Sequence, residues 1–118
     1  MTDLIACLSS GEKSNSHVQK LIEGQDWKNV FLVASSDARS NFICKKDVNF
    51  IVVDFQKPVA DLIEDIRKNL QGKTSDLDVA LNLVSGNGKE HMAILSALLK
   101  LGLGIRLMAV TKDGVMEL

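Results

Sequence analysis

The sequence predicts an α/β fold: a Rossmann-like three-layer domain with a mostly parallel sheet and a C-terminal antiparallel hairpin. Short apolar segments alternate along the chain with segments of helical periodicity, which is the order of a parallel α/β sheet. The apolar segments are continuous rather than alternating, as expected of strands covered on both faces. The chain has 118 residues, 46% apolar and 25% charged. We therefore expect a single domain spanning residues 1–118.

Six segments are predicted to be strands. Each is short and apolar, and polar turn formers or glycines bound most of them. The predicted strands are Leu4 to Leu8, Val30 to Ala34, Asn49 to Phe55, Val79 to Val84, Ile105 to Val110 and Val115 to Leu118. The turn Thr111-Lys112-Asp113-Gly114 joins the last two and predicts a hairpin at the edge of the sheet.

Three helices are predicted between these strands. The first runs from His17 to Glu23 and ends at Gly24. Pro58 opens the second, whose apolar residues follow a 3.6-residue period before it ends at Gly72. The third is the nearly all-apolar segment from Lys89 to Leu101. Each helix connects two predicted strands, as parallel pairing requires.

Composition excludes several classes of function. Fourteen Lys plus Arg against fifteen Asp plus Glu give a net charge of −1, whereas duplex nucleic-acid binders carry a strong basic excess. Four Phe, one Trp and no Tyr leave few platforms for stacking single-stranded bases. No signal peptide and no apolar run of about 20 residues is present, so we expect a cytoplasmic protein without membrane contact.

The two cysteines, Cys7 and Cys44, lie among apolar residues and are expected to be buried free thiols. A disulfide framework or a zinc site needs more sulfur, or histidine at ligand spacing. We therefore expect no metal and no cofactor.

Two polar loops follow predicted strands and are the candidate ligand-binding segments. One runs from Ser9 to Ser16 after the first strand, and the other is Ser85-Gly86-Asn87-Gly88-Lys89 after the fourth. In open α/β sheets, ligands bind beyond the carboxyl ends of the strands where the strand order reverses. If the order is 3-2-1-4-5, the two loops face each other at that point.

The second loop has the chemistry of an anion site. Gly86 and Gly88 allow close approach of a ligand to the backbone, and the following helix presents its N-terminus. Lys89 places a cation at the same point. The alternative is an ordinary strand-to-helix turn with a solvent-facing lysine. The known phosphate motifs do not fit, because Glu90 follows Gly88-Lys89 and His91 stands where a dinucleotide fingerprint has its third glycine.

The two histidines, His17 and His91, each begin a predicted helix beside one of the loops. They are candidates for hydrogen-bond donors or a general acid, and the alternative is that each is a surface residue in a first turn. Asp37 and Asp54, after the second and third strands, are candidates for ribose contacts or for turn formers.

These motifs resemble the CRISPR-associated Rossmann fold (CARF) domains. That family has a polar, Ser-containing loop after its first strand and, after its fourth, a Ser or Thr followed four positions later by Lys or Arg. Ser85-Gly86-Asn87-Gly88-Lys89 matches the second motif, and His91-Met92-Ala93 continues into an apolar helix as in the family. The first-strand loop corresponds to Ser9, Ser10, Asn15, Ser16 and His17.

The resemblance implies a homodimer whose paired loops bind a cyclic oligoadenylate second messenger. Lys89 and the amides of Gly86 and Gly88 would hold phosphate, and Ser85 would contact phosphate or ribose. Ser10 and His17 would line the rest of the pocket. Some members also cleave the ligand without a metal, through attack of the ribose 2′-hydroxyl on the adjacent phosphate. Lys89 and His17 are the candidate catalytic residues for such a ring nuclease.

Two other classes of function remain open from the sequence. One is a non-enzymatic α/β module for assembly or regulation. The other is an enzyme that acts on a small phosphorylated metabolite.

Overall fold

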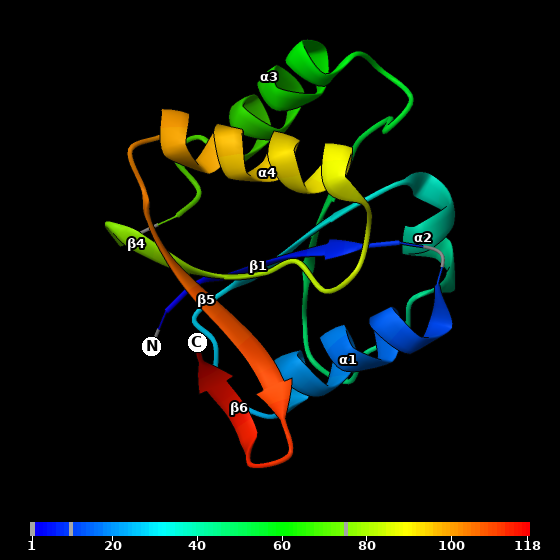
Figure 1. The fold of residues 1–118 in the computed structure, drawn as a ribbon, viewed down its shortest axis with the longest axis vertical. Coiled ribbons are helices and arrows are strands. Elements are labelled where there is room, and N and C mark those ends of the chain that lie inside the picture. Colours follow the sequence, from blue (N-terminus) through cyan, green and yellow to red (C-terminus); the bar gives the residue numbers. More distant parts are fainter. Residues whose placement is uncertain (1, 10, 75) are drawn as a thin grey trace.

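The sheet of the computed structural model has six strands in the order β3-β2-β1-β4-β5-β6 (Figure 1). The structure describes residues 2–9, 11–74 and 76–118. The first five strands pair in parallel, and β6 pairs antiparallel with β5. The strands are β1 Leu4–Leu8, β2 Val30–Ala34, β3 Asn49–Val52, β4 Asp78–Asn82, β5 Gly104–Thr111 and β6 Gly114–Glu117. The predicted fold class and strand order are confirmed.

Four helices cover the two faces of the sheet, which makes three layers (Figure 1). They are α1 Glu12–Glu23, α2 Ser36–Asn41, α3 Val59–Leu70 and α4 Gly88–Lys100. The buried residues of α3 and α4 pack with one set of strand residues, and those of α1 and α2 pack with the other. Every residue of β1 and of β2 is buried, which explains why these strands are apolar without alternation.

The helices differ from prediction at two places. Helix α1 begins at Glu12, five residues before the predicted start at His17. Helix α2 is not predicted at all, because it is only six residues long and Ala38 is its one buried residue. The Ser35 hydroxyl caps α2 by accepting the Ala38 N–H at 3.2 Å. The first turn of α1 and almost all of α2 are polar, so neither shows the hydrophobic periodicity that would indicate a helix.

Two strands end earlier than predicted, and this shapes the edge of the sheet. Strand β3 ends at Val52 rather than at Phe55, although the Val53 N–H still bonds to the Ala34 carbonyl at 2.9 Å. Strand β4 ends at Asn82 rather than at Val84, where the Asn82 side chain accepts the Val84 N–H at 3.2 Å and replaces a sheet bond. The apolar residues beyond each strand end therefore belong to loops.

No helix within residues 2–9, 11–74 and 76–118 is long and apolar enough to cross a membrane.

Candidate functional site

The two loops singled out from the sequence are in direct contact. Strands β1 and β4 are neighbours, with Ala6 paired to Asn82, so the loops leave the sheet side by side. The Ser85 hydroxyl accepts the Ser9 N–H at 2.7 Å and donates to Ser9 Oγ at 2.8 Å. The expectation that these loops face each other at the reversal of strand order is confirmed. Ser10 lies outside the described residues.

Ser85 is the centre of a hydrogen-bond network and is fully buried. Ser14 Oγ and Asn15 Oδ1 both lie 3.2 Å from its hydroxyl, and the Asn15 amide donates to the Ser9 carbonyl at 2.6 Å. The network ties the first turn of α1 to the β4–α4 loop. Ser85 and Asn15 thus shape the loops in this structure, while Ser16 is exposed.

Gly86 has a conformation and a packing environment that require glycine. Its φ is +103°, and a Cβ there would lie 2.7 Å from Glu90 Oε1 and 2.8 Å from the sulfur of Cys7. At Gly88, by contrast, a Cβ would meet no atom within 4 Å. Only the first of the two glycines is needed for close packing of the loop against β1.

Helix α4 begins with a capping box. The Asn87 side chain accepts the Glu90 N–H at 3.0 Å, and the Glu90 carboxylate accepts the Asn87 N–H at 3.1 Å. Asn87 followed three positions later by Glu90 is the usual sequence signature of this motif, whereas the predicted helix begins only at Lys89. A carboxylate of the chain therefore already interacts with the N-terminus of the helix.

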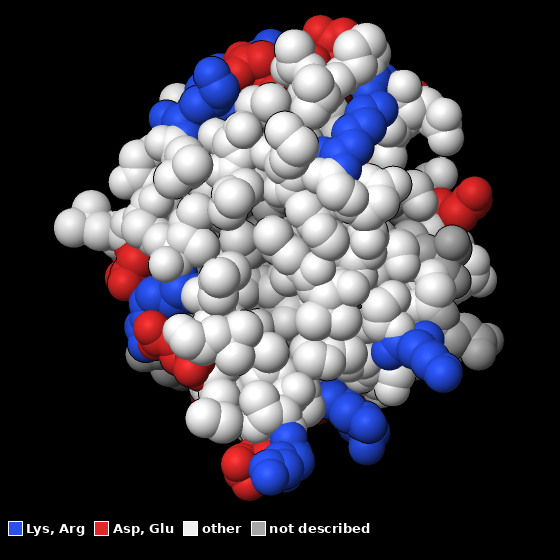
Figure 2. Space-filling model, in the orientation of Figure 1, with Lys and Arg blue, Asp and Glu red and all other residues white. Residues whose placement is uncertain are grey.

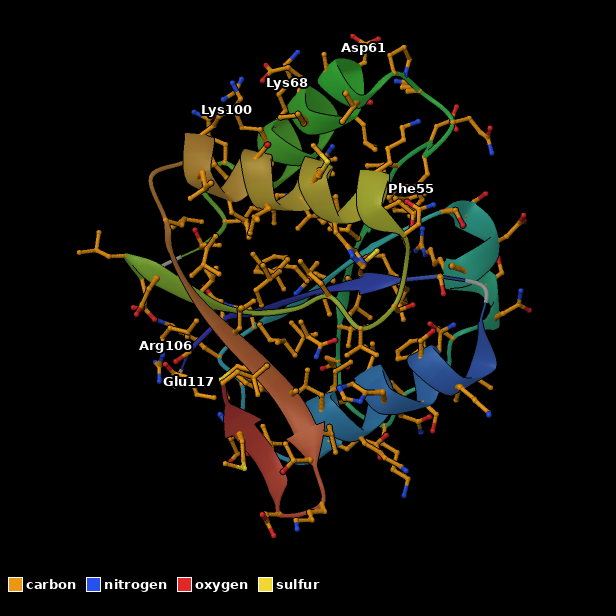
Figure 3. The ribbon with its side chains drawn as sticks, viewed as in Figure 1. Phe55, Asp61, Lys68, Lys100, Arg106 and Glu117 are labelled. Carbon is orange, nitrogen blue, oxygen red and sulfur yellow. The ribbon has the colours of Figure 1, made fainter. Side chains whose placement is uncertain are left out.

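Lys89 connects α4 to the segment that follows β3. Its ammonium group donates to the Phe55 carbonyl at 2.9 Å. The lysine side chain is exposed, and Figure 3 shows Phe55 beside the first turn of α4. Lys89 thus bonds the start of α4 to the segment after β3.

The histidines lie in different surroundings. His17 Nε2 accepts the Val110 N–H at 3.3 Å and lies 3.3 Å from the Asn82 amide nitrogen, so this ring nitrogen carries no proton. Burial and the nearby Lys20 charge lower the pKa of His17 below its usual value. His91 Nε2 donates to the Ser85 carbonyl at 2.8 Å. His91 therefore supports the β4–α4 loop, whereas His17 joins α1 to β4 and β5.

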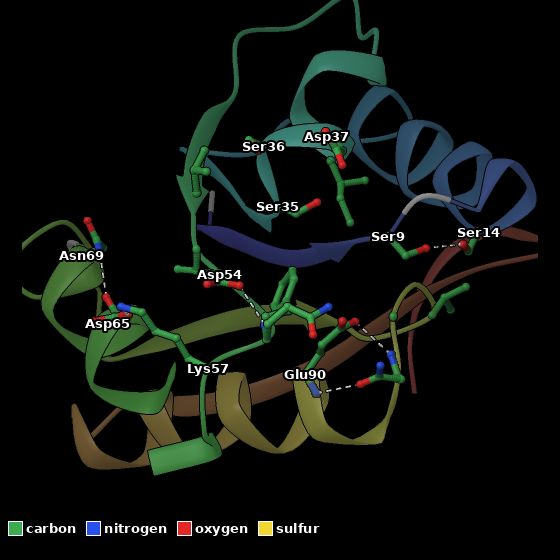
Figure 4. A pocket seen from close by; sticks show the side chains of 18 residues that line it. Ser9, Ser14, Ser35, Ser36, Asp37, Asp54, Lys57, Asp65, Asn69 and Glu90 are labelled. Carbon is green, nitrogen blue, oxygen red and sulfur yellow. Dashed lines mark hydrogen bonds and ion pairs between the residues drawn. The ribbon is translucent and has the colours of Figure 1, made fainter. Parts of the chain in front are cut away.

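A cleft of about 960 Å³ opens at the carboxyl ends of β1, β2 and β3 (Figure 4). Of the predicted site residues, Ser9, Gly86 and Asn87 line it, whereas Asn15, Ser16, His17, Ser85, Gly88 and Lys89 do not. Asp37 and Asp54, the sequence-based candidates for ribose contacts or turn formers, also line it. The rest of its walls come mainly from residues outside the two predicted loops: Ser35, Ser36, Val52, Val53, Phe55, Gln56, Lys57, Asp65, Asn69 and Glu90. These residues could have been predicted to line the site, because the carboxyl ends of all parallel strands lie at the same edge of a sheet.

Carboxylates outnumber cations in this cleft, but most of them have partners. Lys57 Nζ lies 2.8 Å from Asp65 Oδ2, and this pair raises the pKa of Lys57. Asp54 Oδ1 accepts the Gln56 N–H at 2.9 Å, as the turn-former alternative predicts. The carboxylate of Asp37 makes no hydrogen bond or ion pair with any residue that the structure describes. In Figure 4, Asp37 and Ser35 lie across the cleft from Asp54, Lys57 and Glu90.

The cysteines are free thiols, as predicted, but only Cys7 is fully buried. Burial, reinforced by the Glu90 charge, raises the pKa of Cys7 to about 12. Cys44 is partly exposed rather than buried, because its segment, 42–48, runs over the surface between α2 and β3. In the part of the chain that the structure describes, no three His, Cys, Asp or Glu side chains are grouped so that they could hold a metal ion.

No protein-family model matches this sequence, and a search of curated proteins finds no match to it.

Proposed function

We propose that this chain binds a nucleotide ligand where the β1–α1 and β4–α4 loops meet, and that the ligand is a cyclic oligoadenylate shared by two copies of the chain. The observation that carries the proposal is the direct contact between Ser9 and Ser85. It joins the two loops at the reversal of strand order, which is where open α/β sheets bind ligands. The resemblance of Ser85-Gly86-Asn87-Gly88-Lys89 to the CARF motif supplies the class of ligand.

The surface beside these loops supports a second copy as the partner. Met92 and Leu99 project from α4 with 65% and 62% of their surface exposed, and Leu107 on β5 is 46% exposed. Figure 2 shows that the face in front of α4 and β5 is largely free of charged side chains. Apolar surface of this kind favours association. Because Met92 lies one turn after the β4–α4 loop, pairing through α4 would bring two such loops together.

Binding, rather than cleavage, is the activity that the geometry supports. His17 Nε2 is engaged by the Val110 N–H, and Lys89 Nζ bonds to the Phe55 carbonyl. The contacts that His17 and Lys89 make do not point either group toward the place where the two loops meet. Lys89 can reach a ligand more easily than His17 can, because its side chain is exposed and only has to give up its hydrogen bond to the Phe55 carbonyl. We therefore assign Lys89 to phosphate binding.

Native mass spectrometry with cyclic tetra-adenylate and cyclic hexa-adenylate tests the proposal. We expect one ligand per two chains, with no loss of mass from the ligand on incubation. Lys89→Ala should weaken binding about tenfold or more, because a charged hydrogen bond to phosphate is lost. Lys100→Ala is the matched control, since Lys100 lies at the opposite end of α4 (Figure 3) and should leave binding unchanged.

The proposal fails if neither cyclic nor linear oligoadenylates bind at micromolar concentration. A dimer whose stability is indifferent to Lys89→Ala, and which no oligoadenylate stabilises, would instead favour an assembly module. A thermal shift with sugar phosphates but not with nucleotides would favour an enzyme of phosphorylated metabolites.

A further inference from the structure

We infer that the cleft beyond β2 and β3 is a nucleoside subsite, in which Phe55 packs against the base and Asp37 accepts a hydrogen bond from the ribose 2′-hydroxyl. The inference rests on the proposed function, because it assigns the uncharged part of the nucleotide to a place next to the two loops. It goes beyond that proposal, since neither Phe55 nor Asp37 belongs to either loop.

The spacing of the two residues follows from the sheet register. Ala34 at the end of β2 pairs with Val52 at the end of β3, and neighbouring strands lie about 4.8 Å apart. Asp37 comes three residues after Ala34, and Phe55 comes three residues after Val52. The two side chains therefore start from adjacent strand ends and line the same cleft. Both side chains are therefore available to one ligand in the cleft, whose volume is about 960 Å³.

The cleft has both kinds of surface that a nucleoside needs. Its apolar lining comes from Leu8, Val52, Val53, Phe55 and Val84, and Phe55 is its one aromatic residue within the described chain. Phe55 is half-buried against the α3 and α4 side of the core, so its ring is held in place. An aromatic ring offers a stacking surface to any base.

The polar lining consists mainly of hydrogen-bond acceptors. The Asp37 carboxylate has no hydrogen-bond or ion-pair partner among the described residues, and Glu90 and Asp54 add two more carboxylates to the lining, across the cleft from it. Lys57, the cation in the lining, is paired with Asp65. Phosphate is disfavoured among these groups by like-charge repulsion. Ribose hydroxyls and the exocyclic amine of adenine are donors, and they suit acceptors of this kind.

The experiment is an amide NMR titration of the full chain with adenosine. We expect the largest shifts at Ser36, Asp37 and Phe55. 2′,3′-Dideoxyadenosine should bind about tenfold more weakly, because it lacks the 2′-hydroxyl that donates to the charged acceptor. Asp37→Asn should weaken adenosine to a similar extent and leave dideoxyadenosine unaffected. Asp61→Asn removes an exposed carboxylate of α3 outside the cleft and serves as the matched control.

The outcomes separate the subsite from the proposed function. The subsite is overturned if adenosine shifts no cleft amide, or if Asp37→Asn and the dideoxy analogue bind as well as the originals. If cyclic oligoadenylate binds with equal affinity to wild type and Asp37→Asn, the subsite fails and the proposed function stands. If adenosine binds in the cleft but no oligoadenylate binds, the proposed function fails and the subsite stands.

Discussion

The Ser85 hydroxyl accepts the backbone N–H of Ser9 at 2.7 Å across 76 positions of sequence. The bond joins the end of β1 to the loop before α4, and its donor and acceptor belong to the two segments with the strongest ligand-binding signal. Ser85 is fully buried, so in this structure its hydroxyl holds the loops together and does not face solvent.

Replacement of Ser85 by alanine should destabilise the fold. The half-buried Ser9 N–H would lose its acceptor, and the fully buried space of the Ser85 hydroxyl would be left empty, which together cost about 1–3 kcal/mol. Urea unfolding followed by circular dichroism measures the change. Ser40→Ala is the control, because Ser40 is exposed on α2 and should change the free energy of unfolding by no more than about 0.5 kcal/mol. Equal effects of the two substitutions would contradict the role assigned to Ser85.

Gly86→Ala and Gly88→Ala should have opposite consequences. At Gly86 the added Cβ would clash with Glu90 Oε1 and the Cys7 sulfur at a positive φ, so we expect a loss of about 2 kcal/mol or more. At Gly88, in the first turn of α4, the added Cβ meets nothing, and alanine should be neutral or stabilising. Thermal unfolding of the two variants checks this, and a tolerated Gly86→Ala would refute the packing described for the loop.

Stability should fall in mild acid because of His17. The pKa of His17 is lowered in the folded state, so the unfolded chain takes up the proton first. This contribution to stability is fully present above the pKa of the histidine in the unfolded chain, near 6.5. It is lost as the pH falls from there towards the lower pKa of the folded state. Denaturant unfolding between pH 8 and pH 5 in wild type and His17→Gln measures it. The free energy of unfolding of the variant should depend less steeply on pH. Equal slopes in the two proteins would exclude His17 as the source of the pH dependence.

The two thiols should differ in reactivity. With a pKa of about 12, Cys7 has a thiolate fraction of about 10⁻⁴ at pH 8, and it is also inaccessible. Iodoacetamide should therefore modify the partly exposed Cys44 in the folded protein and both cysteines in urea. Peptide mass spectrometry locates the label. Rapid labelling of Cys7 in the folded chain would mean that the β4–α4 loop opens over β1.

The fold follows from the sequence because its signals are local. The apolar residues of α3 recur at Leu62, Ile66 and Leu70, and all three are buried as the period predicts. The predicted start of α1 is five residues late because the first turn of the helix is fixed by contacts with Ser85, 70 and 71 residues away. No local pattern reports such contacts.

The candidate site was only partly predictable for the same reason. The contact between the Ser9 and Ser85 loops follows from strand order, which the alternation of elements indicates. The cleft also depends on where β3 ends, and Asn49 to Phe55 is apolar enough to suggest a longer strand. Because β3 stops at Val52, Asp54 and Phe55 turn into the wall of the cleft.

Glycine amide resonances report most directly on whether a nucleotide binds where the two loops meet. In a titration of the ¹⁵N-labelled chain with cyclic tetra-adenylate, the account predicts shifts at Gly11, Gly86 and Gly88, which lie in or beside those loops. It predicts no shift at Gly72 or Gly102, which lie two residues beyond the ends of α3 and α4. Unchanged spectra, or shifts confined to Gly72 and Gly102, would contradict it.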